Sequence, residues 1–368
     1  METAAVLGNA LSLPLPYPIH VQRGALTSLG AAVTQWAPAH RYAVIADATV
    51  WRMHGPRCLS AFPTSQTRVF EVPPGEHEKS RERWSQLTDA LLEWGAARDT
   101  TIVAIGGGVI GDLAGFVAAT FMRGVPFIQV PTTLLAMVDA SVGGKTGVDT
   151  PAGKNLVGAF HDPRGVVIDP DVLATLPYGV FRSGIAEMIK HGVVADASYF
   201  QAMVRDMDVL RIGSNVRPMG QAIADSVRIK ASVVTQDSRE GGVRRILNFG
   251  HTIAHAVERE MRYEILHGDA VAIGMILEAQ IAEQMGVAER GLVDAVRGAV
   301  AKASLPTVLP KSLSASAVVA ATRGDKKSQG GSVRYALPRS IGEMEAAGGE
   351  WSVEVPEAVV LSVLASSK

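Results

Sequence analysis

Short apolar runs alternate with helical patterns in the first half of this chain, and this alternation restricts its fold more than any other feature. Four runs are typical of buried strands, at 42–46, 101–105, 126–130 and 165–168. Two intervening segments carry apolar residues at helical spacing, 81–94 and 113–121. Because strands that alternate with helices pair in parallel, the pattern predicts a parallel sheet with helices on its faces.

The second half of the chain has a different pattern. From 181 to 303 the apolar spacing is almost wholly helical, and a last segment at 332–337 alternates like a strand. We expect these helices to be separated by the glycines Gly220, Gly250 and Gly286.

The change of pattern falls at Leu176-Pro177, and it predicts a domain boundary. At 368 residues the chain is long enough for two domains, each with a core of its own. The predicted fold class is α/β, with an N-terminal Rossmann-like parallel-sheet domain over 1–177 and a mainly α-helical C-terminal domain over 178–368.

The composition favours small molecules as partners. The formal net charge is −1 and the Lys and Arg residues are scattered, which argues against nucleic acid or an acidic lipid surface. Charged residues make up 19% of the chain, against about 25% in a typical domain. We therefore expect part of the apolar surface to be covered in a homo-oligomer.

Several features predict a soluble, cytoplasmic protein. A single cysteine, Cys58, excludes an intrachain disulfide and a thiolate metal cluster. The N-terminus has no basic region, and prolines interrupt its apolar stretch, unlike a signal peptide. The most apolar later segment, 102–120, contains five glycines and Asp112, which is unlike a membrane span.

A glycine-rich turn follows the second predicted strand. Residues 106–111 fit G-x-G-x-x-G between a strand and a helix, where glycines let backbone N–H groups approach a pyrophosphate. The dinucleotide pattern also expects an acid about 20 residues later, but 126–135 contains none, and Asp47 after the first strand is the best substitute. A turn that only packs is the alternative. A P-loop at 142–146 is rejected, because its first required glycine falls on Asp139.

Polar side chains gather among glycines and small residues between 123 and 155. Charges in loops at strand ends are suited to an anionic, hydroxyl-rich substrate, although each residue alone reads as a solvated loop position. The residues are Arg123, Thr132, Thr133, Asp139, Lys145, Lys154 and Asn155.

Two lysines lie on predicted helices in positions that need explanation. Lys230 shares an apolar stripe with Ile223 and Val227, so it either needs a buried counter-anion or extends from the rim of the stripe to solvent. Lys190 follows Glu187 by three residues and precedes His191, so all three share one helical face. That face is either a metal ligand beside a phosphate-orienting cation or an ordinary surface.

Histidines and a glutamate predict a catalytic zinc-type site with an open position. His251 and His255 are spaced i, i+4, so both can chelate one ion from one side of a helix. A second set takes His251, His267 and Glu187 as ligands and leaves His255 for proton transfer or phosphate contact. Spacing does not decide between the two sets, and three purely structural histidines are the remaining alternative.

The motifs of the chain resemble those of the 3-dehydroquinate synthase family. The first four are Gly-Gly-Gly-Val-Ile-Gly-Asp at 106–112, Pro-Thr-Thr-Leu-Leu at 131–135, Asp-Ala-Ser-Val-Gly-Gly-Lys-Thr at 139–146 and Gly-Lys-Asn at 153–155. The others are Ala-Glu-Met-Ile-Lys at 186–190, the run at 244–252, His-Gly-Asp-Ala-Val at 267–271 and Asp-Lys-Lys at 325–327. They occur in consistent order from about residue 40 to about residue 340.

The resemblance implies a shikimate-pathway lyase that converts 3-deoxy-D-arabino-heptulosonate 7-phosphate into 3-dehydroquinate and phosphate. It further implies bound NAD in the first domain and a divalent metal, zinc or cobalt, in the second. In that family NAD oxidises the C5 alcohol, phosphate is eliminated, the hydride returns to C5, and an aldol step closes the ring, so no net redox occurs. Closure of the helical domain over the sheet domain is expected to exclude water.

The resemblance also implies roles for individual residues. The metal ligands are Glu187, His251 and His267. The NAD-binding positions are Asp47, Glu76, Lys79, Gly107, Gly108, Asp112, Thr132, Thr133, Lys145, Lys154 and Thr175. The substrate-binding and catalytic positions are Asp139, Lys145, Asn155, Lys190, Lys230, Arg244, Asn248, His255 and Lys326. Arg123 matches a position that reaches the substrate phosphate of a neighbouring subunit, which implies a homodimer.

Two other enzyme classes are alternatives. A related sugar-phosphate cyclase that makes a valiolone or an inosose would differ at the carboxylate-recognising positions, where Arg244, Asn248 and Lys326 are of the dehydroquinate type. A metal-dependent polyol dehydrogenase would release NADH. A nucleotide-binding module without catalysis would leave the metal cluster and the lysines unexplained. One departure from the family is Asp269, which stands where Glu is common.

Overall fold

The computed structural model describes residues 10–59, 62–210, 217–323 and 333–367. Contacts divide the chain into two compact units. The sheet unit comprises Met1–Leu176 and Ser214–Ala231, and the helical unit comprises Pro177–Gly213 and Ser232–Lys368. The segment from Ser214 to Ala231 therefore groups with the sheet, although it lies in the second half of the chain.

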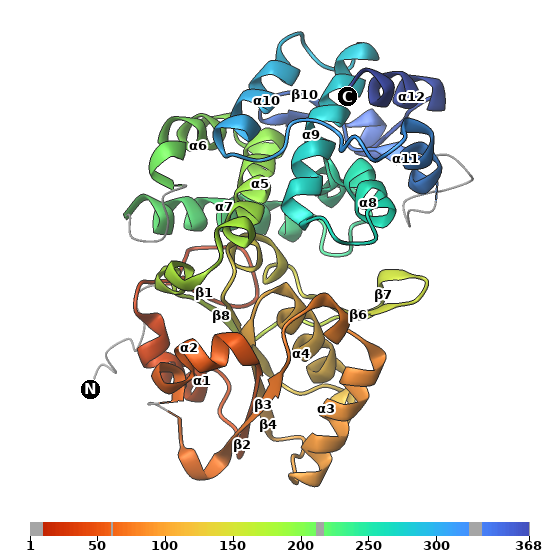
Figure 1. Cartoon of the computed structure of the whole chain (residues 1–368). Helices are drawn as coiled ribbons and strands as arrows, with labels where there is room; N and C mark the ends of the chain where they lie inside the picture. Colours follow the sequence, from red (N-terminus) through yellow and green to blue (C-terminus); the bar gives the residue numbers. More distant parts are fainter. Residues whose placement is uncertain (1–9, 60–61, 211–216, 324–332, 368) are drawn as a thin grey trace. The chain divides into compact units, whose positions relative to one another are not determined.

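A six-stranded parallel sheet forms the centre of the sheet unit (Figure 1). Its strands, in spatial order, are β1 (Ile19–Val21), β8 (Gly165–Ile168), β5 (Phe127–Pro131), β4 (Thr100–Gly106), β2 (Arg41–Asp47) and β3 (Thr67–Val72). Every neighbouring pair is parallel, so the predicted α/β class is confirmed. The sequence did not predict β1 or β3, because β1 has only three residues and β3 exposes every other residue at one end.

Helices cover both faces of this sheet. Helices α1 (Leu29–Trp36) and α2 (Ala48–Leu59) lie on one face, and α3 (Arg81–Glu93) and α4 (Gly108–Thr120) lie on the other (Figure 1). This placement follows from the strand order, because right-handed crossovers to one side of the sheet put their helices on one face and crossovers to the other side put theirs opposite.

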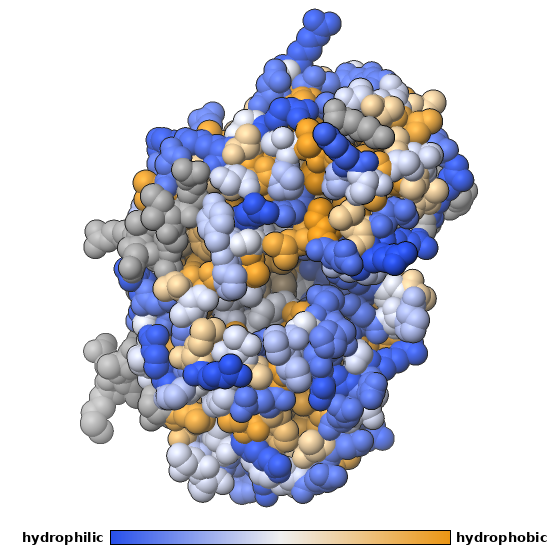
Figure 2. Space-filling view, in the orientation of Figure 1, coloured by the Kyte–Doolittle hydropathy of each residue, from blue (hydrophilic) through white to orange (hydrophobic). Residues whose placement is uncertain are grey.

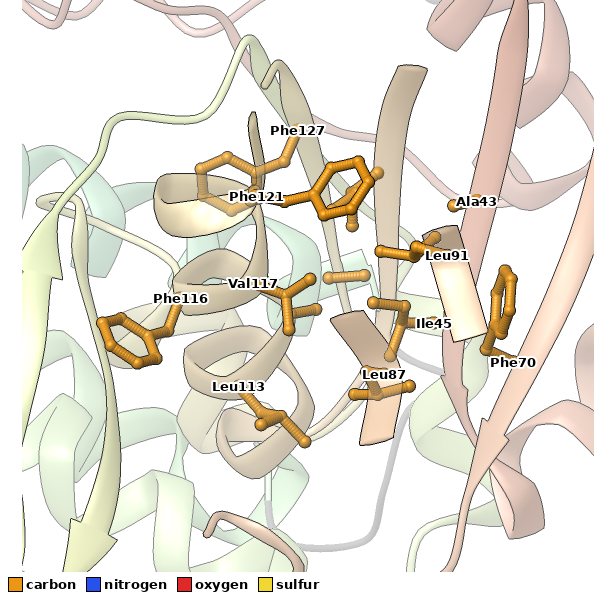
Figure 3. Packing of buried hydrophobic residues seen from close by; sticks show 14 of the residues in the cluster. Ala43, Ile45, Phe70, Leu87, Leu91, Leu113, Phe116, Val117, Phe121 and Phe127 are labelled. Atoms are coloured by element: carbon orange, nitrogen blue, oxygen red, sulfur yellow. The ribbon is translucent and has the colours of Figure 1, made fainter. Parts of the chain in front are cut away.

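One hydrophobic core of the sheet unit lies between the sheet and the helices α3 and α4. Leu87 and Leu91 of α3, with Leu113 and Val117 of α4, pack against Ile45 of the sheet (Figure 3). Each of these side chains is at most 6% exposed. At about 1.5–3 kcal/mol per large apolar side chain, burial of this kind is the main stabilising term of the unit.

Helix α4 also packs against an antiparallel hairpin of β6 (Lys145–Thr150) and β7 (Gly153–Phe160). It is buried on two sides, which explains an almost continuous apolar sequence in a helix of 13 residues. Among the described residues, no helix has the length and apolarity needed to cross a membrane.

The hairpin corrects one expectation. Lys145, Lys154 and Asn155 were expected in loops, but all three lie in its strands. Glycines interrupt the alternation of side chains by which strands are predicted from sequence. Gly147 and Gly158 face each other across the hairpin, and a Cβ on Gly158 would lie 2.1 Å from the backbone oxygen of Thr146. The two strands therefore need glycine where a side chain would otherwise reveal their periodicity.

The helical unit is built around α5 (Tyr178–Ala195) and α9 (His267–Gln284), whose residues are mostly buried. Around them lie α6 (Ala197–Leu210), α8 (His251–Glu260), α10 (Leu292–Lys302), α11 (Ala315–Thr322) and α12 (Glu357–Ser366) (Figure 1). The short strands are β9 (Arg334–Tyr335), β10 (Pro338–Ser340), β11 (Glu343–Met344) and β12 (Val353–Glu354).

Two expectations for the second half need adjustment. Gly220 does not separate helices, because it lies inside α7 (Arg217–Gln236), where the apolar stripe that contains Ile223 and Val227 continues the helix. Gly250 and Gly286 do flank helices, and both have positive φ angles. The strand expected at 332–337 is β9, which has two residues, and residue 332 lies outside the described part of the chain.

Candidate active site

The carboxyl ends of β2 and β4 form the topological switch point of the sheet. These strands are neighbours, but β2 leads to β3 on one side and β4 leads to β5 on the other. Loops that diverge in this way leave space for a ligand between them. Asp47 ends β2, and Gly106 ends β4, so the acid and the glycine-rich turn lie on adjacent strands.

The glycine-rich turn gives α4 an N-terminus suited to phosphate. Gly107 is the N-cap of the 13-residue helix and has no side chain to occupy its first amides, which are left for an anion. A Cβ on Gly107 would lie 3.0 Å from the Thr133 methyl group. Thr132 precedes Thr133 in the chain. The hydroxyl of Thr132 is buried without a hydrogen-bond partner among the described residues.

Asp47 has a structural partner as well as a candidate role. One of its oxygens, Oδ1, accepts the N–H groups of Thr49 and Val50 at 2.8 and 3.1 Å, so it caps the first turn of α2. These bonds fix the carboxylate at the end of β2. Thr175, at the end of the 3₁₀ helix Pro170–Thr175, is paired with the buried His54 at 2.9 Å. No sequence motif pointed to His54.

A buried lysine joins three carboxylates in the sheet unit. Lys79 is 5% exposed, and its Nζ lies 3.0 Å from Glu76, 3.4 Å from Asp112 and 3.6 Å from Asp149. The resemblance implied the first three of these residues but not Asp149. Lys154 lies 3.9 Å from the same Glu76 oxygen. We call Glu76, Lys79, Asp112 and Asp149 the Lys79 cluster.

Burial and charge act against each other in the Lys79 cluster. Burial raises the pKa of Asp112 to about 6, although Lys79 opposes the shift. Burial also raises the pKa of Asp149. The pKa of Glu76 is lowered, because Lys79 and Lys154 outweigh the effect of burial. Burial alone would lower the pKa of Lys79, but the three carboxylates raise it, so the lysine stays charged.

The free energy of unfolding of the Asp112→Asn variant, measured relative to that of the parent, is expected to increase as the pH rises. Asp112 has a higher pKa in the folded chain than in the unfolded chain, so the folded chain binds more protons between the two pKa values. The contribution of Asp112 to stability therefore decreases from about pH 4 to about pH 6 and stays low above. The difference in free energy of unfolding between variant and parent should increase by about 3 kcal/mol over this range. Urea titrations at several pH values measure it, and a constant difference would contradict the raised pKa.

Lys230 has a counter-anion, which was one of the two alternatives that the sequence left open. Its Nζ donates to the backbone oxygen of Asp139 at 2.5 Å and to Oδ1 of the same residue at 2.6 Å. The lysine is 6% exposed, on a helix face with the fully buried Ile223 and Val227. Asp139 lies in a π-helical turn, Ala136–Ala140, and such turns are frequent at functional sites.

Arg123 lies in an unusual backbone segment. It is exposed, and both Met122 and Arg123 have positive φ angles, 51° and 68°, before Gly124 at 115°. Positive φ is uncommon in residues other than glycine, and it presents the arginine from a tight turn after α4.

In the helical unit, three helices bring a glutamate and two histidines together. Glu187 lies in the buried middle of α5, and His251 and His267 are the first residues of α8 and α9. Oε1 of Glu187 lies 3.5 Å from Nε2 of each histidine. One ligand atom from each residue fits within 4.8 Å of the others, so the three could hold a metal ion.

The opposite ring nitrogens support this arrangement. Nδ1 of His251 lies 3.2 Å from the backbone oxygen of Phe249, and Nδ1 of His267 lies 3.3 Å from Glu258. An acceptor at Nδ1 leaves the lone pair of Nε2 for a metal, as is usual for metal-ligating histidines. His255 is exposed and is not part of the group. The geometry thus favours Glu187, His251 and His267 over the pair His251 and His255.

Charge around the three residues is uneven. Lys190 forms an ion pair with Oε2 of Glu187 and is 1% exposed, so the expected alternative of an ordinary surface face is wrong. Burial, with Lys190 next, lowers the pKa of His251 well below its usual value. Burial also acts to lower the pKa of His267, but its hydrogen bonds to the carboxylates of Glu187 and Glu258 raise it to about 10. Carboxylates that favour a proton there also favour a divalent cation.

Arg244 and Asn248 lie in the 3₁₀ helix Val243–Asn248, just before α8. Arg244 is 2% exposed and donates to the backbone oxygen of Ser238 at 2.6 Å. Asn248 donates to Glu240 at 2.8 Å. The sequence reasoning missed Glu240, whose φ is 61°. Lys326, the remaining candidate, lies outside the described residues.

Solved structures with the same fold define the class of the chain. A 2-deoxy-scyllo-inosose synthase complexed with carbaglucose-6-phosphate, NAD⁺ and Co²⁺ superposes with a TM-score of 0.87, at 24% identity over 98% of this chain and 99% of that one. A 2-epi-5-epi-valiolone synthase from Streptomyces hygroscopicus, with NAD⁺ and Zn²⁺ bound, gives 0.85 at 27% identity over 96% of each chain. The fold is that of the sugar-phosphate cyclases.

Sequence comparison identifies the family within this class. The family model described as 3-dehydroquinate synthase N-terminal matches residues 69–183, and the one described as 3-dehydroquinate synthase C-terminal matches 184–328. A 3-dehydroquinate synthase from Nostoc punctiforme is 42% identical over 355 residues, 95% of this chain and 96% of that one. The chain belongs to the 3-dehydroquinate synthase family. The expected family and the expected class of enzyme, a carbon–oxygen lyase, are confirmed.

Proposed function

We propose that the chain converts 3-deoxy-D-arabino-heptulosonate 7-phosphate into 3-dehydroquinate and phosphate with bound NAD and a divalent metal, zinc or cobalt. The observation that carries the metal assignment is the position of Glu187 Oε1, 3.5 Å from Nε2 of both His251 and His267. Both Nδ1 atoms face protein acceptors. A carboxylate with two imidazoles is a donor set typical of catalytic zinc.

We assign NAD to the carboxyl ends of β2 and β4. When bound, NAD takes up and returns a hydride at an alcohol carbon, and a divalent cation polarises the carbonyl that results. The amides at the start of α4 would bind the pyrophosphate. Asp47 would accept hydrogen bonds from a ribose. The Lys79 cluster would hold its carboxylates in place beside the cofactor, with Thr132, Thr133, Lys145, Lys154 and Thr175 as further contacts.

Several buried cations are assigned to the substrate. Lys190 and Lys230 are buried and carry a carboxylate partner each, which fixes their Nζ atoms. Fixed ammonium groups bind and orient phosphate and hydroxyl oxygens through charge-assisted hydrogen bonds. Arg244, with its planar guanidinium, and Asn248 are suited to a carboxylate. The other assigned positions are Asp139, Lys145, Asn155, His255 and Lys326.

We also infer that the protein is a cytoplasmic homodimer in which Arg123 acts on the partner's substrate. The exposed arginine in its positive-φ turn supports a contact outside its own chain. Leu156 and Phe160 of β7 are 44% and 56% exposed, which is apolar surface that a second copy could cover. Elsewhere, on the face in Figure 2, hydrophobic residues form separate groups among hydrophilic ones.

The proposal predicts phosphate release without net redox. Purified protein with zinc and a catalytic amount of NAD should release phosphate from the heptulosonate phosphate while the absorbance of NADH stays flat, because the hydride returns to the substrate. Phosphate assays and absorbance at the NADH band measure both quantities. Steady production of NADH from a polyol, with no phosphate release, would instead identify a dehydrogenase.

Product analysis separates this function from that of related cyclases. NMR spectra of reactions with the heptulosonate phosphate and with sedoheptulose 7-phosphate should show a carbocyclic product only from the first. The reason is that Arg244 and Asn248 favour a substrate with a carboxylate. A valiolone-type product from sedoheptulose 7-phosphate would reassign the substrate.

A further inference from the structure

Two buried glutamates beside the metal centre are not ligands and have no role in the function proposed so far. Glu258 is 3% exposed and Glu278 is fully buried. Glu258 lies on α8, the helix that begins at His251, and Glu278 lies on α9, the helix that begins at His267. Burying a carboxylate is costly unless it is hydrogen-bonded, so the partners of each residue indicate what it does.

Glu258 reaches from α8 to the histidine of α9. Its Oε1 lies 3.3 Å from Nδ1 of His267. A carboxylate at this position accepts the Nδ1–H hydrogen bond and therefore favours the tautomer whose Nε2 has a free lone pair. It also fixes the rotation of the ring, so that Nε2 stays 3.5 Å from Glu187.

Glu278 reaches in the opposite direction, from α9 to the first turn of α8. Its Oε2 accepts the N–H of Gly250 at 2.7 Å, and its Oε1 accepts the N–H of Ile253 at 3.1 Å. These amides flank His251, and an N-terminal helix turn attracts negative charge. The same turn follows Phe249, whose backbone oxygen lies 3.2 Å from Nδ1 of His251.

The backbones of the two helices are in close contact at this point. Gly250 has a φ of 81°. A Cβ on Gly274 of α9 would lie 2.0 Å from the backbone oxygen of Gly250. The position of the first turn of α8 is thus fixed by the close contact between Gly250 and Gly274 and by the two hydrogen bonds that its N–H groups donate to Glu278. A small displacement of this turn would move His251 relative to His267.

We propose that α8 and α9 position each other's metal-ligating histidine through two buried carboxylates, Glu258 acting on His267 and Glu278 acting on His251. Both are positioning residues, and the inference rests on the proposed metal centre. The positioning is reciprocal, because each helix supplies one ligand and also the carboxylate that positions the ligand of the other helix.

Metal affinity and the metal spectrum test this proposal. Zinc dissociation constants are measured by chelator competition, and the visible spectrum of the cobalt-loaded protein reports ligand geometry. Glu258→Leu and Glu278→Leu should each weaken zinc binding by about 10- to 100-fold and alter the cobalt spectrum. Glu258→Gln should recover most of the affinity, because the amide oxygen still accepts from Nδ1. Glu278→Gln should recover less, because one of its two acceptors becomes a donor.

Glu283 provides a matched control on the same helix. It accepts the N–H groups of Gly291 and Val293 at 3.0 and 2.9 Å, so it caps α10 as Glu278 caps α8, but α10 carries no proposed ligand. Glu283→Leu should lower the melting temperature of the metal-free protein and leave the zinc dissociation constant within about twofold of the parent.

Three results would overturn the proposal. Unchanged zinc affinity and cobalt spectrum in Glu258→Leu and Glu278→Gln, with metal loss in His267→Ala, would reject the positioning roles and keep the metal centre. Equal weakening in Glu283→Leu would show that general destabilisation causes the effect. Retention of metal by His267→Ala would reject the metal centre itself, and the positioning roles with it.

Discussion

His267→Ala is expected to lose its metal and, with it, phosphate release from the heptulosonate phosphate, by about 10³-fold or more. His267 belongs to the proposed ligand set, in which one ligand atom from each of three residues lies within 4.8 Å of the others. Two remaining ligands bind a divalent ion weakly, and Lewis-acid polarisation is worth several kcal/mol of barrier. Metal content per chain after dialysis and the rate of phosphate release measure the two effects.

His255→Ala is the control for that experiment. His255 is exposed, and its ring lies 5.5 Å from that of His251 at 90°, but it is not in the ligand group. The variant should keep the metal and lose rate, as expected of a substrate contact. Equal metal content in the parent and in His267→Ala would contradict the ligand set.

Lys79→Met is expected to have the largest effect on stability. The variant leaves the partly buried Asp112 and Asp149 and the more exposed Glu76 close together without their shared cation. Breaking a buried ion pair on one side typically costs about 3–5 kcal/mol in the free energy of unfolding. Urea titration at neutral pH measures this loss, and the variant should also retain less NAD through purification.

The pH dependence of Lys79→Met gives a second test. Without the cation, the pKa values of Asp112 and Asp149 rise further above those of the unfolded chain, and the lowered pKa of Glu76 rises too. The folded variant therefore takes up protons in mild acid. The stability defect should therefore be largest above about pH 7 and smaller near pH 5. Lys154→Met, which removes a more exposed amine 3.9 Å from Glu76, should cost less than about 1 kcal/mol. Equal losses in the two variants would contradict the central role of Lys79.

Much of the sheet unit could be predicted because its signals are local. Strands β2, β4, β5 and β8 are apolar runs, since parallel strands are buried on both faces. The helical spacing of its neighbours placed Lys230 on an apolar stripe, where it would either need a buried anion or extend to solvent. The hairpin of β6 and β7 was missed, because glycines required by close strand contact removed the alternation.

Residue spacing in the sequence does not predict which residues form the candidate metal centre. His251 and His255 are close in sequence and share a helix, whereas Glu187 lies more than sixty positions from His251. Spacing left both ligand sets open, and the family resemblance chose between them by analogy. The arrangement of α5, α8 and α9 brings Glu187, His251 and His267 together and leaves His255 exposed.

The sequence by itself determined the α/β class, the glycine-rich turn after β4, the family and most candidate residues, because each depends on periodicity or on a contiguous motif. Only the tertiary structure decided which carboxylates share Lys79, which ring nitrogen of each histidine faces Glu187, and that Glu258 and Glu278 lie within hydrogen-bond distance of His267 and of the first turn of α8. Those contacts join segments up to eighty positions apart, and no local pattern encodes the packing that brings them close to each other.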